Sequence, residues 1–229
     1  MKIRATKDKK GSLAIKAYQL LKKGIVSLEL KPGEKLDIQK LEKEMSLGRT
    51  PIREALFKLE AENLIESHPN KGSYVRYISF QDVKNLFEAL FIIEKFAAKL
   101  ASRRITSKQL QEMKQINKSI NKALEERNFL EITLQNSNFH KLLAKASANQ
   151  YIFSILNTVQ NEAQRLAYLS YSQETPVNYP LEEHFRLVRQ HHANIINFLE
   201  KKQTEDLENQ IVEHIELFRT RILKYLSPE

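Results

Sequence analysis

Glycine is confined to the first third of the chain, and this distribution constrains the fold more than any other feature. All five glycines of the 229 residues lie before residue 73. Because glycine supplies the positive φ angles that tight turns and hairpins need, a chain without it is suited to helices. The sequence therefore predicts a domain with tight turns, followed by a domain built from helices.

The balance of positive and negative charge changes near the same boundary. Residues 1–79 carry 17 Lys and Arg against 10 Asp and Glu, whereas residues 80–229 carry 20 against 18. A basic domain attracts polyanions such as DNA through screened Coulomb forces and counterion release. Surface lysines often serve only solubility, so charge alone leaves DNA binding open. We expect two domains, at 1–79 and 80–229.

The overall composition excludes several classes of protein. Cysteine is absent, which removes disulfides, thiolate metal sites and thiol nucleophiles. The 41% hydrophobic and 28% charged content is that of a globular chain with a packed core. No uncharged run approaches the roughly 20 residues that span a bilayer, and the N-terminus has no apolar stretch of signal-peptide length. We expect a cytoplasmic protein without a membrane partner.

The basic part contains a helix-turn-helix pattern. Apolar residues three and four apart predict helices over residues 13–28 and 38–45, with Asp37 as the cap of the second. Thr50, followed by a proline, predicts that a further helix begins there and runs over 51–62, with the threonine side chain as its cap. Two short helices joined by a tight turn are typical of DNA-binding proteins.

A β-hairpin, the wing, is expected after these helices. Residues 64–68 and 73–77 have strand character and flank a turn that ends at Gly72. Lys71 and Gly72 would then lie at the wing tip, against the DNA backbone or the minor groove. The order of helices and strands predicts a winged helix-turn-helix.

The second short helix supplies the other candidate DNA contacts. Arg49 and Arg53 lie near its start, where guanidinium groups reach phosphates or the N7 and O6 atoms of guanine. Thr50 adds a phosphate contact if its oxygen is not committed to the helix cap. Two arginines on a helix are often ordinary solvated residues, but their place at a helix start in this arrangement favours DNA binding.

These motifs resemble the DNA-binding domain of GntR-type bacterial transcription regulators. Two departures are visible: Gly48 stands where the family usually has Ser or Thr, and Asn63 where it usually has Gly. The first removes a hydroxyl that could contact a phosphate. The second fits, because Asn tolerates the left-handed conformation of a helix end. The resemblance covers nearly all of residues 13–77 and is carried by KPGEKL at 31–36, LGRTPIREAL at 47–56, LEAENLI at 59–65 and KGSYV at 71–75.

The sequence predicts an all-α bundle for residues 80–229. Thr106 with Gln109 resembles a capping box, and Thr204 is placed to cap the last helix. The predicted fold is therefore mainly α, with an N-terminal winged helix-turn-helix and small β-hairpin followed by an all-α helical bundle. Apolar residues three and four apart mark six helices, over residues 80–102, 107–126, 129–147, 149–172, 181–202 and 205–226.

Five of the six histidines lie in the helical part. His192 and His214 lie on the last two helices, which a short loop makes antiparallel neighbours, and His140 lies on another. Three converging imidazoles with a side-chain oxygen would suit Zn²⁺, Ni²⁺ or Mn²⁺ and leave coordination positions open. His191 is an alternative to His192, and His184 is a weaker competitor. Scattered histidines are mostly surface or hydrogen-bonded core residues, so spacing alone does not establish a metal site.

Residues 82–226 resemble the all-helical effector domain, called FCD, of the FadR-like GntR subgroup. Many members hold a metal with an Asp-x-x-x-His pair and two later histidines. The resemblance places Asn136 and His140 at the pair, and His192 and His214 at the later positions. Because Asn136 replaces the aspartate, the site has no anionic ligand, which weakens metal affinity and favours an anionic effector as an extra ligand.

The resemblance also bears on the effector. Metal-type members often carry an arginine four residues before the glutamate that matches Glu94, and this sequence has Leu90 there. A carboxylate effector would then depend on the metal, with Arg165 as a substitute partner. We expect the effector to be an organic acid or another small anion.

We interpret the chain as a ligand-responsive, DNA-binding transcription regulator, more often a repressor in such families, and not as an enzyme. One winged module reads too few base pairs for genomic specificity, so we expect a homodimer on a palindromic operator. Metal or effector binding in the helical domain would alter DNA affinity. One alternative is a metal-dependent enzyme with an accessory basic domain, although no Glu or Asp is placed as a general base beside the histidines. Another is an architectural nucleic-acid binder without a ligand.

Overall fold

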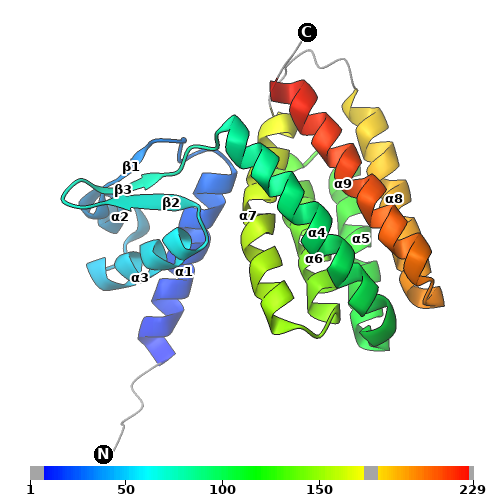
Figure 1. The fold of residues 1–229 in the computed structure, drawn as a ribbon. Coiled ribbons are helices and arrows are strands. Elements are labelled where there is room, and N and C mark those ends of the chain that lie inside the picture. The colour runs from blue at the N-terminus through cyan, green and yellow to red at the C-terminus, as the bar shows by residue number, and fades with distance from the viewer. Residues whose placement is uncertain (1–7, 173–179, 227–229) are drawn as a thin grey trace, which may run out of the picture. The chain divides into compact units, whose positions relative to one another are not determined.

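A computed structural model describes residues 8–172 and 180–226. The chain divides between Ile78 and Ser79 into two compact units, which we call the N-terminal unit and the helical unit. The predicted fold class is confirmed, because helices make up most of both units and the only described strands form one small sheet (Figure 1). Within the described residues, no helix is both long and apolar enough to cross a membrane.

The N-terminal unit is a winged helix-turn-helix. Its helices are α1 (Asp8–Val26), α2 (Ile38–Met45) and α3 (Arg49–Ala61). The sequence predicts the hairpin but misses the first strand, because two residues are too few to show an alternating pattern. Its three strands form an antiparallel sheet in the order β1-β3-β2, with β1 (Lys35–Leu36), β2 (Ile65–His68) and β3 (Gly72–Val75).

Aliphatic side chains from all three helices and the wing form the core of the N-terminal unit. The predicted inward face of α3 is confirmed, since Ile52 and Leu59 are fully buried and Leu56 nearly so. For the first helix, the apolar spacing predicts six inward positions, and this is partly wrong: Leu13 and Leu20 are exposed, and Leu28 is half-buried and lies beyond the end of α1. The other three, Ala17, Leu21 and Ile25, are fully buried. Each fully buried aliphatic side chain contributes about 1.5–3 kcal/mol to folding, so this core holds α3 firmly in place.

The start of α3 differs from the prediction. The helix begins at Arg49, with Gly48 as its N-cap and no side-chain cap hydrogen bond. The prediction that Thr50 caps the helix is therefore wrong. Pro51 is tolerated at the third helical position because the first four N–H groups of a helix have no intrahelical partner. The Thr50 hydroxyl and the first N–H groups of α3 are thus free of capping bonds.

Two other helix ends in this unit agree with the sequence, whereas α1 begins five residues before and ends two residues before its predicted bounds. The Asp37 side chain caps α2 by accepting a hydrogen bond from the backbone N–H of Lys40, at 2.9 Å. Asn63 adopts the left-handed conformation just after α3, with φ of 58°. A polar contact also ties α1 to this end of α3: the Tyr18 hydroxyl donates to the Glu62 carboxylate at 2.8 Å.

The described part of the helical unit contains six helices, whose bounds agree with the prediction to within two residues. The capping box of Thr106 with Gln109 is confirmed. Thr204 is itself the first residue of the last helix, and its hydroxyl lies 2.9 Å from that of Ser102, so its predicted capping role is wrong. The helices are α4 (Phe80–Arg104), α5 (Ser107–Glu125), α6 (Phe129–Ala146), α7 (Gln150–Ser172), α8 (Leu181–Lys201) and α9 (Thr204–Leu226).

Helix α4 is central to the helical unit, where it packs on α6, α7 and α9 (Figure 1). The apolar spacing predicts an inward face of Leu86, Leu90, Ile93, Ala97 and Leu100. Leu86, Leu90 and Ala97 are buried as predicted, whereas Ile93 and Leu100 are only half-buried. Glu94, four residues after Leu90, is buried as well. A charged residue thus occupies an inward position of an otherwise apolar helix face.

Candidate functional site

A groove with a volume of about 490 Å³ lies between α3 and the wing in the N-terminal unit. We call it the α3 groove. Four of the five predicted DNA-contact residues line it, namely Arg49, Arg53, Lys71 and Gly72, and all four are exposed. Thr50 is exposed as well but does not line the groove. The structure thus brings together residues of the α3 start and the wing tip that are separated by about 20 positions in the sequence.

The groove carries a surplus of uncommitted positive charge. Lys35 of β1 joins the arginines and the wing lysine in lining it. Among the described residues, none of these four cations forms an ion pair. Two acidic residues also line the groove, and both accept hydrogen bonds from backbone N–H groups: Asp37 from Lys40 at 2.9 Å and Glu60 from Ser67 at 3.1 Å. Such a surface is electrostatically suited to a polyanion.

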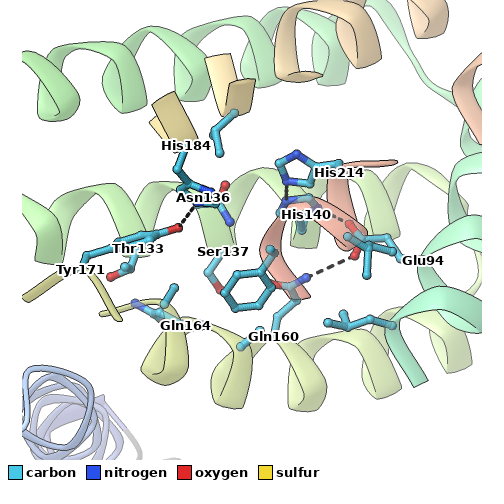
Figure 2. Close-up of a pocket in the computed structure, with 16 residues that line it drawn as sticks. Glu94, Thr133, Asn136, Ser137, His140, Gln160, Gln164, Tyr171, His184 and His214 are labelled. Carbon is cyan, nitrogen blue, oxygen red and sulfur yellow. Dashed lines mark hydrogen bonds and ion pairs between the residues drawn. The ribbon is translucent and has the colours of Figure 1, made fainter. Parts of the chain in front are cut away.

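Three of the four predicted metal ligands meet inside the helical unit. They are His140 on α6, His192 on α8 and His214 on α9. One ring nitrogen from each of the three residues lies within 4.8 Å of the other two nitrogens. The Nε2 atoms of His140 and His214 are 3.2 Å apart (Figure 2). His191, the alternative to His192, is half-buried and does not belong to this group. We call these three residues the histidine triad.

His192 is the most informative member of the triad. Its side chain is 0% exposed, and neither ring nitrogen has a hydrogen-bond partner among the described residues. The ring stacks on Phe139, with centroids 4.3 Å apart, and Nδ1 of His214 is also unpartnered. Burial, with the neighbouring imidazoles, holds the pKa values of His192 and His214 well below their usual range. His192 and His214 therefore offer neutral nitrogens whose burial without a partner costs free energy.

Glu94 is a residue of this site to which the sequence analysis gave no role. Its carboxylate is 1% exposed and accepts a hydrogen bond from Nδ1 of His140, while its other oxygen lies 3.5 Å from Nε2 of Gln160 (Figure 2). A carboxylate on Nδ1 fixes the tautomer in which the Nε2 lone pair is directed away from it. The signal was present in the sequence, because Glu94 follows Leu90 by four residues on the inward face of α4.

A small cavity of about 40 Å³ opens beside the triad. Asn136, one helical turn before His140 on α6, lines it, so the fourth predicted ligand lies at the cavity wall. Figure 2 shows Tyr171 and His184 on the side of the cavity away from Glu94; the Tyr171 hydroxyl lies 3.0 Å from Nε2 of His184. Burial, together with the nearby Arg221, lowers the pKa of His184 to about 3. Tyr171 and His184 thus form a neutral polar wall opposite the Glu94 carboxylate.

No Lys or Arg is among the described residues that line this cavity. Leu90 lines it at the position where the resemblance leads us to look for an arginine. Arg165 is buried on α7 but lies outside the lining, so the structure does not place it in contact with a ligand in this cavity. The effector contact of Arg165 stays a prediction.

Two family matches cover most of the chain. Residues 13–75 match the bacterial regulatory proteins of the gntR family, and residues 85–217 match the FCD domain. The chain is 26% identical over 199 residues to the HTH-type transcriptional repressor RspR of Escherichia coli K12, covering 87% of this chain and 84% of the relative. It is 30% identical over 186 residues to the HTH-type transcriptional regulator LutR of Bacillus subtilis. This match covers 69% of this chain and 81% of LutR.

Solved structures show the same fold. Escherichia coli McbR/YncC superposes with a TM-score of 0.80 at 19% identity, covering 94% of this chain and 99% of the other. A putative transcriptional regulator GntR from Rhodococcus sp. RHA1 superposes with a TM-score of 0.72 at 17% identity. This match covers 93% of this chain and 98% of the other. The sequence relatives are transcription regulators, and the alternative of a metal-dependent enzyme has no support among them. The chain belongs to the gntR family of bacterial regulatory proteins and is a DNA-binding transcription regulator with an FCD domain.

Proposed function

We propose that the protein represses transcription by binding a palindromic operator through the α3 groove, and that a ligand in the helical unit changes this binding. Arg49 and Arg53 would contact base edges and phosphates. Thr50, with the uncapped N–H groups at the start of α3, would hold a phosphate, as helix N-termini do. Lys71 and Gly72 would lie against the backbone or the minor groove. The observation that carries the proposal is the set of exposed, unpaired cations that line one groove.

The operator-binding form is a homodimer in this proposal, since two wings on a twofold axis read a palindrome. The helical unit offers a surface for this contact. On α4, Ile92 is 72% and Phe96 is 52% exposed. They line a shallow depression with Phe91 and with Val212 of α9. Lys95, Lys99 and Glu208 also line it, and both lysines form ion pairs with Glu208. Apolar surface of this kind is covered at protein interfaces, so we place the dimer contact on α4 and α9.

A divalent metal fits the histidine triad. His140, His192 and His214 supply neutral nitrogens, and Asn136 supplies an amide oxygen from the cavity wall. This donor set suits Zn²⁺, Ni²⁺ or Mn²⁺. The bound ion would supply a positive centre in a cavity whose described lining has no Lys or Arg. Glu94 would orient His140 and bring the nearest negative charge to the ion.

The effector is a small anion in this proposal. Three imidazoles and an amide leave the charge of a divalent ion uncompensated, so an anionic group is favoured as a further ligand. Because no cationic side chain is among the described residues that line the cavity, a second anionic group on the same molecule would have no charged partner in that lining. The cavity therefore favours an effector with one anionic group that binds at the metal.

Metal or effector binding in the helical unit would act on DNA binding through a population shift. It changes operator affinity only if it favours one arrangement of the two DNA-binding units over another. Repression is the proposed outcome, in line with the relative RspR, which is named a transcriptional repressor. Because operator DNA lies in the bacterial cytoplasm, this function places the protein there.

Operator binding with and without metal tests the proposal. A palindromic site is first selected from random duplex oligonucleotides with the full-length protein. The dissociation constant is then measured for metal-free protein and for protein loaded with Zn²⁺, Ni²⁺ or Mn²⁺, with and without small carboxylates. We expect sequence preference in the wild type, and a change with metal or carboxylate that His192→Ala abolishes. A protein without preference for any duplex over random competitor would overturn the proposal.

A further inference from the structure

Phe57 is an exposed aromatic side chain on the helix that carries the two arginines of the α3 groove. It is 70% exposed, and it lines the groove together with Arg49 and Arg53. The three residues follow one another at intervals of four, which places them along one side of α3 at steps of about 6 Å. The groove-facing side of the helix thus presents two guanidinium groups followed by a phenyl ring.

Packing within the N-terminal unit does not account for Phe57. The core positions of α3 are Ile52, Ala55, Leu56 and Leu59, which are buried by contact with α1 and the wing. Of the apolar side chains among the described residues that line the groove, Phe57 alone is exposed; Leu36 and Leu56 are buried and Ile38 is half-buried. A large aromatic ring that remains in water in the free protein gains free energy when a partner covers it.

The charge around Phe57 favours DNA over a protein as that partner. The ring shares the groove with four unpaired cations, and an apolar protein surface would have to desolvate them without compensation. Duplex DNA supplies phosphates for the cations and one apolar group on its major-groove edge, the C5-methyl group of thymine. We propose that Phe57 contacts a thymine methyl group in each operator half-site and thereby selects a thymine next to the bases that the arginines read.

This inference rests on the proposal that α3 enters the major groove, and one experiment separates the two. The operator selected by the wild-type protein is resynthesised with single thymines replaced by uracil, which pairs normally but lacks the methyl group. Dissociation constants are measured for each duplex with the wild type and with Phe57→Ala, Phe57→Leu and Glu54→Ala. Glu54 is the matched control, because it is exposed on α3 but does not line the groove.

For the wild type we expect one thymine per half-site at which uracil weakens binding about fourfold, the ratio that corresponds to one buried methyl group. Phe57→Ala should bind the thymine operator more weakly and lose this ratio at that position alone. Phe57→Leu should keep part of the ratio, and Glu54→Ala should keep all of it. Circular dichroism on melting should show that the Phe57 variants are folded, since the side chain is outside the core.

Two results would overturn the inference. One is a wild type that binds its selected operator equally well with uracil at every position. The other is a set of uracil ratios that Phe57→Ala leaves unchanged, which would assign the methyl contact to another residue. If the wild type selects no operator at all, the binding proposal itself fails. Should Phe57→Ala abolish binding altogether, the ratio measured with Phe57→Leu decides: a ratio equal to that of the wild type would contradict the contact, and a reduced one would support it.

Discussion

The Nε2 atoms of His140 and His214 face each other at 3.2 Å in the buried interior of the helical unit. Because the Glu94 carboxylate accepts a hydrogen bond from Nδ1 of His140, a neutral His140 directs an unprotonated Nε2 toward His214. His192 adds two further ring nitrogens without partners. This arrangement favours a cation between the rings over a hydrogen-bond network that closes on itself.

Replacing His192 should remove the metal. His192→Ala deletes one of three imidazole ligands, so we expect metal bound at stoichiometric level in the wild type to be lost on dialysis. The measurement is elemental analysis of protein loaded with Zn²⁺, Ni²⁺ or Mn²⁺. His191→Ala is the matched control, because its neighbouring ring lies outside the triad. Equal loss in both variants, or in neither, would contradict the assignment of His192.

Glu94→Gln should weaken metal binding without removing a ligand. The change keeps the shape of the side chain but deletes the charge that orients His140. Loss of such an outer partner typically costs 10–100-fold in metal affinity, so we expect a rise of about that size in the dissociation constant. Competition with a chromophoric chelator measures it. Glu88→Gln, an exposed change on the same helix, should leave the constant unaltered. An unchanged constant in Glu94→Gln would show that the carboxylate has no such role.

The stability of the metal-free protein should fall in acid below about pH 6.5. Burial lowers the folded-state pKa of His184 to about 3, and it also lowers those of His192 and His214. An unfolded histidine titrates near pH 6.5, so below that pH the unfolded state binds more protons and the free energy of unfolding decreases. Each such residue adds a slope of up to about 1.4 kcal/mol per pH unit.

Urea unfolding in the presence of a chelator, from pH 8 to pH 4.5, measures this dependence. We expect a flat profile above the unfolded pKa and a decline below it. His184→Gln should make the decline shallower, whereas His68→Gln, at an exposed position, should not. A profile that is flat down to pH 4.5 would mean that the buried histidines are charged or solvated in the folded protein.

Arg53→Ala should lower operator affinity while leaving the fold intact. The side chain is exposed and lines the α3 groove, so its loss removes a base or phosphate contact worth about 1–3 kcal/mol. Fluorescence anisotropy at several salt concentrations separates the two roles, because loss of a phosphate contact reduces the salt slope by about one. Arg103→Ala, at an exposed position of the helical unit, is the control. Binding equal to that of the wild type would remove Arg53 from the interface.

The sequence predicts most of this fold because its helices are long enough to show their apolar spacing. The prediction fails where the sequence pattern is short or local. Strand β1 has only two residues, and α3 begins without the side-chain cap that was predicted for Thr50. The choice between His191 and His192 also needed the structure. Adjacent residues on a helix point about 100° apart, and only the packing of α8 shows that His192 is the one that is fully buried. Glu94 is visible in the sequence as a charged residue on an apolar helix face. Its contact with His140 spans 46 positions, so the sequence alone does not pair the two residues.

Phe96→Glu should convert the proposed homodimer into a monomer. The side chain is half exposed and lines the depression on α4 and α9 with Ile92, so a carboxylate there would lose its hydration in a twofold contact. Sedimentation velocity should show half the mass of the wild type, and operator affinity should fall because each monomer reads one half-site. Leu134→Glu, a similar change at an exposed position of α6, is the comparison. If it produces monomers and Phe96→Glu does not, the dimer contact lies on another face of the helical unit.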